Sequence, residues 1–266
     1  MTTRFRLLAL ATVVALFSVQ CTQPEGDKTD FPTSIEQNFK AGKFTHSSGY
    51  LNYQECTTAA TAAGKTPLVI VLHGQYANGS DNRSQLRQDA MIRIWHHFAS
   101  NNIKALIVAP QCPSDRTWNE LSKAVDGATM TELVKALVDK LKEERKGLDT
   151  ERIYILGYSD SHKPAGAGGV WRLVAQHTET FAAAIAVAAD PDDDISAKSI
   201  AKTPMLVVKG ETDAYAVALA LDSFADAVHD EGGIFVEKFL SVGTRSEVCR
   251  EAFSTESLDW LLQFKK

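Results

Sequence analysis

The sequence predicts an α/β fold in which a mostly parallel sheet is covered by helices on both faces. Continuous apolar runs of strand length recur along the chain, and such runs are typical of strands buried on both faces. Longer segments with helical spacing of apolar residues lie between them, so strands and helices alternate as they do around a parallel sheet. The chain has 266 residues, 44% of them apolar, and shows no repeat and no second core, which favours a single domain.

The predicted strands start with a half-buried one and continue with buried ones. Residues 49–55 alternate between apolar and polar side chains, as a strand with one solvated face does. The runs that follow are continuous and apolar, and the first two end in glycine and in proline. These runs cover residues 67–74, 103–110, 152–157, 181–189, 204–210 and 234–240.

Helices are expected between these strands. The segment 128–146 has an apolar stripe at Leu133, Ala136, Leu137 and Leu141, which lie on one face of a helix. The other helices are predicted at residues 82–100, from residue 170 onward, at about 215–230 and at 251–264.

The first residues predict an export signal that is not part of the fold. Two arginines precede the apolar run 7–17, whose eleven residues match the core of a signal peptide and are too few to span a bilayer comfortably. Cys21 follows this run closely. The pattern resembles a bacterial lipoprotein signal over residues 1–21, in which Cys21 becomes the lipidated first residue.

This interpretation predicts the domain organisation and the location. Residues 22–45 are polar and contain prolines, which favours a flexible tether, and residues 46–266 are expected to form the single folded domain. The protein is expected to be exported and held at the bacterial cell envelope by the lipid on Cys21, its one contact with a membrane. A soluble secreted or periplasmic protein is the alternative. The net charge of −5 argues against nucleic acid as a partner, because phosphate binding needs a basic surface.

Ligands of an open parallel sheet bind at the carboxyl ends of its strands, so the segments that follow the strands are the candidate site. Three of them carry motifs: LVIVLHGQYANGSDNRSQL, IVAPQCPSDRTW, and RIYILGYS followed by GGVWRL. Together and in this order they resemble the esterase branch of the α/β-hydrolase superfamily. That branch includes feruloyl and acetyl esterases, phospholipase-carboxylesterases, relatives of polyhydroxybutyrate depolymerase and predicted peptidases. The resemblance covers roughly residues 48–264.

The resemblance implies an α/β-hydrolase fold and a serine esterase that acts on a small-molecule or polysaccharide ester without a cofactor or a metal. In this superfamily the catalytic residues come in the order serine, acid, histidine. Ser159, in a strand-to-turn context, matches the nucleophile, and Asp213, after a later strand, matches the acid. The alternatives are an ordinary turn serine and an aspartate that caps the next helix.

The same resemblance implies the oxyanion donors and the rim of the cleft. The donors would be the backbone N–H groups of Asp160 and of Gln75 or Tyr76, directed at the negative charge that develops on the substrate oxygen. His73 and Trp118 are expected at the substrate cleft. The alternatives are a structural role for His73 and a position over the core for Trp118.

The catalytic histidine of the family has no match. The family places it after the last strand, where this sequence reads FLSVGTRSE and Thr244 occupies the position of the base. Threonine has no titratable nitrogen and cannot act as a general base near neutral pH. His162 lies in a five-residue insertion, 161–165, directly after the serine turn, and is the candidate replacement. A solvated loop histidine is the alternative, and the insertion is expected to displace the start of the next helix.

Two functions therefore remain. The first is a serine carboxylic-ester hydrolase with an incomplete Ser-Asp-His triad, which uses Ser159, Asp213 and an unidentified base. The second is a catalytically inactive relative that binds a ligand in the retained cleft. The fold alone does not decide between them, because one fold supports many functions.

Two further features have structural consequences. The segment 189–196, ADPDDDIS, clusters four aspartates, which suits a solvated loop with a helix cap or, less simply, a calcium-like oxygen site. Beyond Cys21 the chain has Cys56, Cys112 and Cys249. Any disulfide is expected to join Cys112 to Cys249, because both follow strands that should end at the same edge of the sheet.

Overall fold

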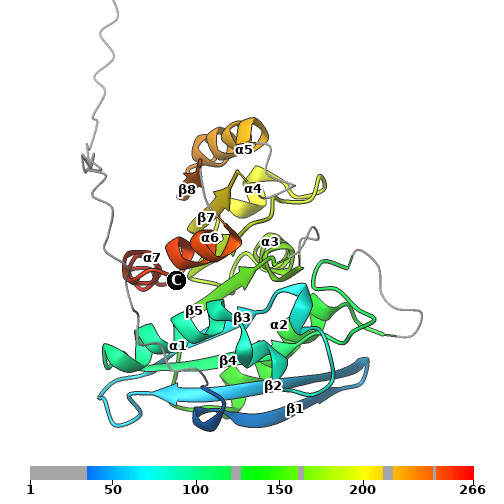
Figure 1. Cartoon of the computed structure of the whole chain (residues 1–266), viewed down its shortest axis with the longest axis vertical. Helices are drawn as coiled ribbons and strands as arrows, with labels where there is room; N and C mark the ends of the chain where they lie inside the picture. Colours follow the sequence, from blue (N-terminus) through cyan, green and yellow to red (C-terminus); the bar gives the residue numbers. More distant parts are fainter. Residues whose placement is uncertain (1–34, 121–126, 161–164, 212–217, 242–243) are drawn as a thin grey trace, which may run out of the picture. The chain divides into compact units, whose positions relative to one another are not determined.

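An eight-stranded sheet lies at the centre of the fold in the part of the chain that the structure describes (Figure 1). The computed structural model describes residues 35–120, 127–160, 165–211, 218–241 and 244–266, all of which belong to one compact unit, Phe31–Lys266. The strands are β1 (Lys40–His46), β2 (Gly49–Thr58), β3 (Thr66–Leu72), β4 (Ala105–Gln111), β5 (Leu148–Tyr158), β6 (Ala183–Val187), β7 (Met205–Gly210) and β8 (Phe235–Leu240).

The order of these strands is β1-β2-β4-β3-β5-β6-β7-β8. β2 runs antiparallel to both of its neighbours, and all the other pairings are parallel. The predicted α/β class with a mostly parallel sheet is therefore confirmed. The buried runs of the sequence are the parallel strands, which are covered on both faces and have no polar side to alternate with.

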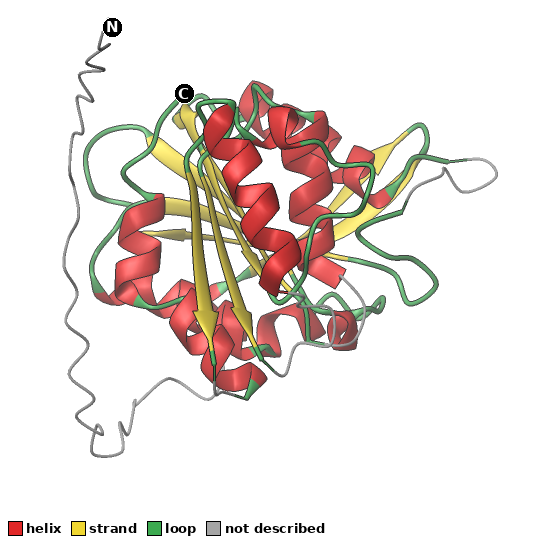
Figure 2. Ribbon diagram, turned by 90° about the horizontal axis from the view of Figure 1, so that it is seen from above, coloured by secondary structure: helices red, strands yellow, loops and turns green. Residues whose placement is uncertain are grey.

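Helices cover both faces of the sheet (Figure 2). One face carries α2 (Met130–Glu144), α3 (Ala165–Gln176), α4 (Ala197–Ile200) and α5 (Ala218–Asp230). The other carries α1 (Asp89–Ser100), α6 (Arg245–Ala252) and α7 (Thr255–Leu261). Short 3-10 turns add η1 (Glu36–Asn38), η2 (Gln75–Ala77) and η3 (Ser84–Arg87). None of the described helices is long and apolar enough to cross a bilayer.

Helix α2 shows how the local sequence fixes an element. Thr129 caps its start: the Glu132 N–H donates to the Thr129 hydroxyl oxygen at 3.1 Å, and the Thr129 N–H donates to the Glu132 carboxylate at 2.8 Å. This reciprocal pair satisfies two N–H groups that a helix start leaves without partners. The predicted stripe then faces the sheet, with Leu133, Leu137 and Leu141 buried.

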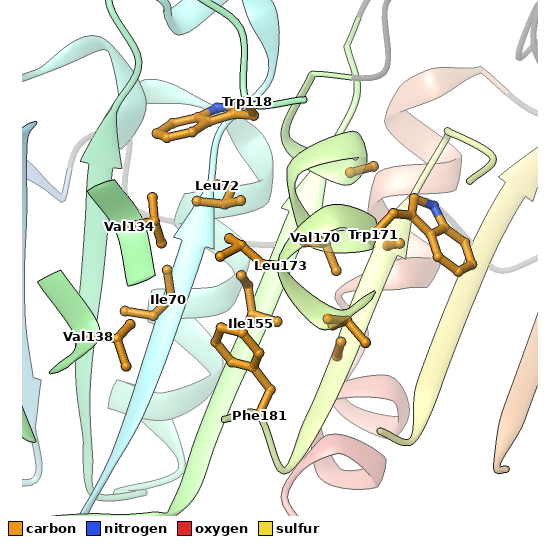
Figure 3. Close-up of a cluster of buried hydrophobic side chains, with 14 of the residues drawn as sticks. Ile70, Leu72, Trp118, Val134, Val138, Ile155, Val170, Trp171, Leu173 and Phe181 are labelled. Atoms are coloured by element: carbon orange, nitrogen blue, oxygen red, sulfur yellow. The ribbon is translucent and has the colours of Figure 1, made fainter. Parts of the chain in front are cut away.

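The core between α2, α3 and the sheet is densely filled (Figure 3). Ile70 and Leu72 of β3 point to the same face because the side chains of a strand alternate with a period of two. They lie near Ile155 of β5, with valines of α2 on one side of them and a valine of α3 on the other in Figure 3. Burying one such side chain stabilises the fold by about 1.5–3 kcal/mol, so this layer holds both helices on the sheet.

The parallel pairing brings the strand ends together at one edge. Leu72 at the end of β3 is the register partner of Gly157 in β5, and Tyr158 pairs with Val187 at the end of β6. Val187 in turn pairs with Val208 in β7. The segments that follow β3, β5, β6 and β7 therefore lie along the carboxyl edge, where ligands of parallel sheets bind.

The folded domain starts earlier than the expected tether allows. Ile35 is fully buried, and β1 pairs with β2 from Lys40 to His46. The part of the expected 22–45 tether from residue 35 onward therefore belongs to the domain. β1 is an edge strand that buries one side chain, Phe44, which explains why its sequence resembles a polar linker.

The prediction that any disulfide joins Cys112 to Cys249 is wrong. Cys112 is buried in the cluster that faces α2 and α3, whereas Cys249 is buried in the cluster beneath α1, α6 and α7. The sheet separates them, although both follow strands that reach the same edge. All three cysteines of the described residues are free thiols, and burial raises the pKa of Cys112 and Cys249, which disfavours the reactive thiolate.

Candidate active site

Ser159 follows the last residue of β5 at the carboxyl edge of the sheet. Its N–H donates to the carbonyl of Val187 at the end of β6, at 3.0 Å, which continues the parallel pairing into the turn. The residue is 1% exposed. The serine is therefore held in a defined position beside the loop after β3, with almost no surface open to solvent.

Helix α3 packs directly on the backbone of the strands next to Ser159. A Cβ at Gly157 would lie under 3.0 Å from the carbonyl of Gly166, and a Cβ at Gly166 would lie equally close to the carbonyls of Leu72 and His73. α3 begins at Ala165, inside the expected insertion 161–165. These glycines allow the close approach of α3 to the strand ends. The expectation that the insertion displaces the helix start stays a prediction, because residues 161–164 lie outside the described part.

His73 and Trp118 form a buried unit over the core. His73 Nε2 accepts a hydrogen bond from the Cys112 N–H at 2.9 Å, so the proton is on Nδ1, which donates to the Gly74 carbonyl at 2.6 Å. Burial lowers the pKa of His73 to about 4. Trp118 is 1% exposed and donates from Nε1 to the His73 carbonyl. Figure 3 shows Trp118 over the core beside Leu72.

The expectation that His73 and Trp118 line the substrate cleft is therefore corrected. Their edge-to-face ring contact and their hydrogen bonds tie the end of β3 to the segment after β4. This unit supports the loop that begins at Gly74. His73 itself is neutral at physiological pH, and both of its ring nitrogens take part in hydrogen bonds. It has no free nitrogen to serve as a base.

Asp160, directly after the serine, turns its carboxylate toward the loop after β3. The Tyr76 N–H donates to it, with the nitrogen 3.2 Å from Oδ2 and 3.4 Å from Oδ1, and Gln88 Nε2 donates to Oδ2 at 2.7 Å. Burial raises the pKa of Asp160, and hydrogen bonds from the backbone N–H groups of Tyr76, Gln75 and Asp160 itself oppose this rise. The candidate oxyanion donors of the resemblance, the N–H of Asp160 and that of Gln75 or Tyr76, thus converge on one carboxylate.

Gln88 is a site residue that the sequence did not indicate. It lies between η3 and α1, and its amide bridges two loops: Oε1 accepts from the Gly74 N–H at 2.9 Å, and Nε2 donates to Asp160. No motif in the sequence marks Gln88, because its partners Gly74 and Asp160 lie 14 and 72 residues away along the chain. Tyr76, by contrast, presents its ring to solvent, 79% exposed, while its N–H faces Asp160.

Thr244, which the resemblance puts at the position of the catalytic base, has a structural role. It is exposed and is the N-cap of α6: its hydroxyl oxygen accepts from the Glu247 N–H at 3.4 Å, and its own N–H donates to the Glu247 carboxylate at 2.5 Å. The spacing T-x-x-E in the sequence indicates this capping box. A threonine is therefore favoured here for starting a helix.

The two other candidates lie outside the described residues. Asp213 falls in the segment 212–217 and His162 in 161–164. β7, which precedes Asp213, ends at Gly210 on the same edge as β5. The described residues therefore bring together Ser159, Asp160 and the loop of Gln75 and Tyr76.

Three of the four aspartates after β6 are held by two buried cations. Lys209, 0% exposed on β7, donates to Asp190 at 2.6 Å, and Arg172 of α3 donates to Asp192 at 2.7 Å and to both oxygens of Asp194 at 2.9 Å. Ser196 caps α4, as the helix-cap alternative expects. Within the described residues no three histidine, cysteine or acidic side chains gather as metal ligands. This loop is an ion-paired brace.

A cavity of about 270 Å³ adjoins this brace at the carboxyl edge. Asp190 and Asp192 form its polar side, and Ile195 with Leu221 and Phe224 of α5 form its apolar side. The combination suits a small ligand that has an apolar part and a polar end.

Comparison with solved structures finds the same fold in esterases. A structure titled thermostable esterase superposes with a TM-score of 0.73 at 22% identity, over 86% of this chain and 64% of that one. A ferulic acid esterase gives 0.60 at 16% identity, over 85% and 98%, and Est1E from Butyrivibrio proteoclasticus gives 0.56 at 15% identity, over 84% and 99%. This chain spans less than two thirds of the thermostable esterase.

No family model matches the sequence, and comparison with curated proteins finds no match either. The strand order, the helices on both faces and these neighbours together define an α/β-hydrolase fold. At these identities the likeness establishes the architecture, and the chemistry has to be argued from the site.

Proposed function

We propose that this chain is a serine carboxylic-ester hydrolase for acyl or polysaccharide esters, with Ser159 as its nucleophile. The observation that carries the proposal is the convergence of the Gln75, Tyr76 and Asp160 backbone N–H groups on one carboxylate beside that serine. N–H groups that hold a carboxylate have the charge preference that a tetrahedral oxyanion needs. The esterases that share the fold support the same class of reaction.

In this reaction the Ser159 hydroxyl oxygen attacks the ester carbonyl carbon, and the alcohol leaves with a proton. Water then hydrolyses the acyl-serine and restores the hydroxyl group. Both steps place negative charge on the former carbonyl oxygen, which the N–H groups of Gln75 and Tyr76 would stabilise. Asp213 would orient the base, and His162 is the candidate for that base.

Three observations favour the second candidate, an inactive relative that binds a ligand. Thr244 serves as a helix cap where the family has its base, Ser159 is almost fully buried, and the donors are already engaged by Asp160. A ligand for such a protein would occupy the cavity beside Asp190 and Phe224.

The location is part of the proposal. Export and a lipid on Cys21 would put the domain at the bacterial envelope, where esters of wall or environmental polysaccharides are accessible. Mass spectrometry of the protein purified from membranes tests this. A diacylglycerol adduct on Cys21 that is lost in Cys21→Ser supports the anchor, whereas an unmodified cysteine in a soluble protein supports simple secretion.

The ester-hydrolase proposal is tested by acyl transfer from 4-nitrophenyl acetate. We expect slow hydrolysis, because a triad without its base loses several orders of magnitude in rate. We also expect an acetyl group on the Ser159 peptide by mass spectrometry, and none in Ser159→Ala. If Ser159 is never acetylated and the two proteins hydrolyse the ester equally, the inactive relative is the correct interpretation.

A further inference from the structure

The carboxylate of Asp160 and the loop after β3 fit each other closely. Gly74 has φ −70° and ψ 170°, a conformation open to any residue, so the backbone itself does not require a glycine. A Cβ at this position would lie under 3.0 Å from the carboxylate carbon and both oxygens of Asp160. The glycine is therefore needed for the close approach of a side chain from another part of the chain.

Gln88 completes this fit. Its carbonyl oxygen accepts from the Gly74 N–H, which fixes the amide plane. Its nitrogen donates to Asp160 at 2.7 Å, a shorter distance than those from the Tyr76 nitrogen to the same carboxylate. An amide held from both ends loses little further freedom when it donates, so the position of the carboxylate is well defined. The two ends of the connection between β3 and α1 thus form a built receptor for one carboxylate.

The donors that the described residues supply to this receptor are uncharged. Within the described residues, Asp160 accepts from backbone N–H groups and from the Gln88 amide, and no arginine or lysine among them contacts it. A set of N–H donors of this kind recognises the negative charge and the geometry of its oxygens, and nothing in it is specific for aspartate. It would bind another carboxylate or a tetrahedral oxyanion equally well.

We propose that Asp160 is an internal occupant of the oxyanion position, so that an ester reacts at Ser159 only when the Asp160 carboxylate moves away. The inference rests on the proposed function for the reaction and adds a regulation of the same site. When Asp160 has moved away, the receptor accepts a small carboxylate or the oxyanion of an acyl intermediate.

Replacement of the side chain by a free carboxylate tests the occupancy without any catalysis. Asp160→Gly removes CH2–COO⁻, which acetate can restore. The full chain is labelled with ¹⁵N, and the Tyr76 amide is followed during titration with sodium acetate against sodium chloride at equal ionic strength. We expect a saturable shift of the Tyr76 amide in Asp160→Gly and none in the wild-type protein. A response in neither protein, or the same response in both, overturns the inference.

Asp160→Asn keeps the shape of the side chain and provides a second readout if Asp160→Gly does not fold. A neutral oxygen accepts more weakly than a carboxylate, so the Tyr76 amide proton should move upfield in Asp160→Asn without any added ligand. An unchanged Tyr76 resonance overturns the inference. The matched control is Asp230→Asn, which removes an exposed carboxylate at the end of α5 and should leave Tyr76 unaffected.

A rate measurement separates this inference from the proposed function. Loss of one oxyanion donor costs about 10²–10³-fold in rate, so release of the occupied donors should raise 4-nitrophenyl butyrate hydrolysis by Asp160→Gly at least tenfold. Acetate should return that rate toward the wild-type value. If acetate binds Asp160→Gly and the rate does not rise, the occupancy stands and the esterase proposal fails.

Discussion

The loop beside Ser159 and the loop after β6 both carry aspartates at the carboxyl edge of the sheet, but the carboxylates have different hydrogen-bond partners in the two loops. Asp190, Asp192 and Asp194 are paired with the buried cations Lys209 and Arg172. Asp160 is bound by neutral N–H donors, and burial raises its pKa, whereas the hydrogen bond from Arg172 lowers the pKa of Asp194.

This difference distinguishes a structural role from a binding role. A carboxylate that is paired with a buried cation cannot leave without exposing that charge to an apolar surrounding, so the pair fixes the fold. A carboxylate held by neutral donors leaves behind N–H groups that water or another anion can satisfy. We therefore assign the Asp190 loop to bracing α3 and β7, and the Asp160 loop to anion binding.

The largest predicted effect is at the braced loop. Asp190→Ala should destabilise the protein by about 3 kcal/mol, because it leaves the Lys209 ammonium buried without its partner. The double variant Asp190→Leu with Lys209→Met should recover most of this loss, as apolar replacements of buried pairs often do. Urea unfolding measures both, with the exposed Asp193→Asn as the control. A small loss for Asp190→Ala would show that Lys209 is solvated after all.

The next effect tests the fit of Asp160 against Gly74. Gly74→Ala should cost about 1–3 kcal/mol through overpacking, and this cost should largely disappear in an Asp160→Gly background. Gly147→Ala is the matched control, because a Cβ at Gly147 meets nothing within 4 Å. Denaturant midpoints of the four proteins of the double-mutant cycle give the coupling energy. Equal costs in both backgrounds would mean that Asp160 does not contact Gly74.

A smaller effect is expected at the position of the missing base. Thr244→Ala should destabilise the protein by about 1 kcal/mol through loss of the α6 cap, while Thr244→Ser should retain the stability. Neither should change slow ester hydrolysis, since the threonine hydroxyl is engaged within its own helix. A tenfold fall in hydrolysis with Thr244→Ala would assign it a direct part in the reaction.

The smallest effects have opposite pH dependences. The pKa of Asp194 is lowered, so its stabilisation is fully present above the ordinary value of 3.8 and is lost as the pH falls through the lowered pKa of the folded state. Asp194→Asn should therefore lower Tm more at pH 6 than at pH 3. The pKa of Asp160 is raised in the folded state, so the wild-type protein loses stability as the pH rises from 3.8 through that raised pKa. Asp160→Asn does not ionise, and its Tm relative to that of the wild type should therefore increase from pH 3 to pH 6. Each difference should be about 1–3 °C by calorimetry. Slopes of the same sign would contradict the comparison.

The sequence was sufficient for the fold because the fold depends on periodic patterns. Buried runs such as 67–74 and the stripe of 128–146 became β3 and α2, since both patterns report burial directly. β1 was missed because an edge strand buries little, and only Phe44 marks it. The Cys112–Cys249 pairing failed because shared strand ends fix the edge of the sheet and leave the face undetermined.

The site was less predictable because its contacts join distant segments. The resemblance suggested Gln75, Tyr76 and Asp160 as donors, but nothing in the sequence indicated that the Asp160 side chain accepts from the same groups. Gln88 has no motif, and Lys209 within an apolar strand gave no sign of its partner. Trp118 was expected at the cleft because its loop follows a strand that ends at the carboxyl edge, whereas its burial depends on the packing of His73.

The most direct test of the central claim is a pH titration of the Tyr76 amide by ¹H–¹⁵N NMR in the wild-type protein. We predict that its shift follows the ionisation of Asp160, with a midpoint above 3.8, and that this titration is absent in Asp160→Asn. His73 titrates at about 4, and Asp160→Asn isolates its contribution because the histidine is retained. A Tyr76 titration that persists unchanged in Asp160→Asn, or whose Asp160-dependent midpoint lies below 3.8, would contradict the claim that a buried Asp160 carboxylate is held by this N–H group.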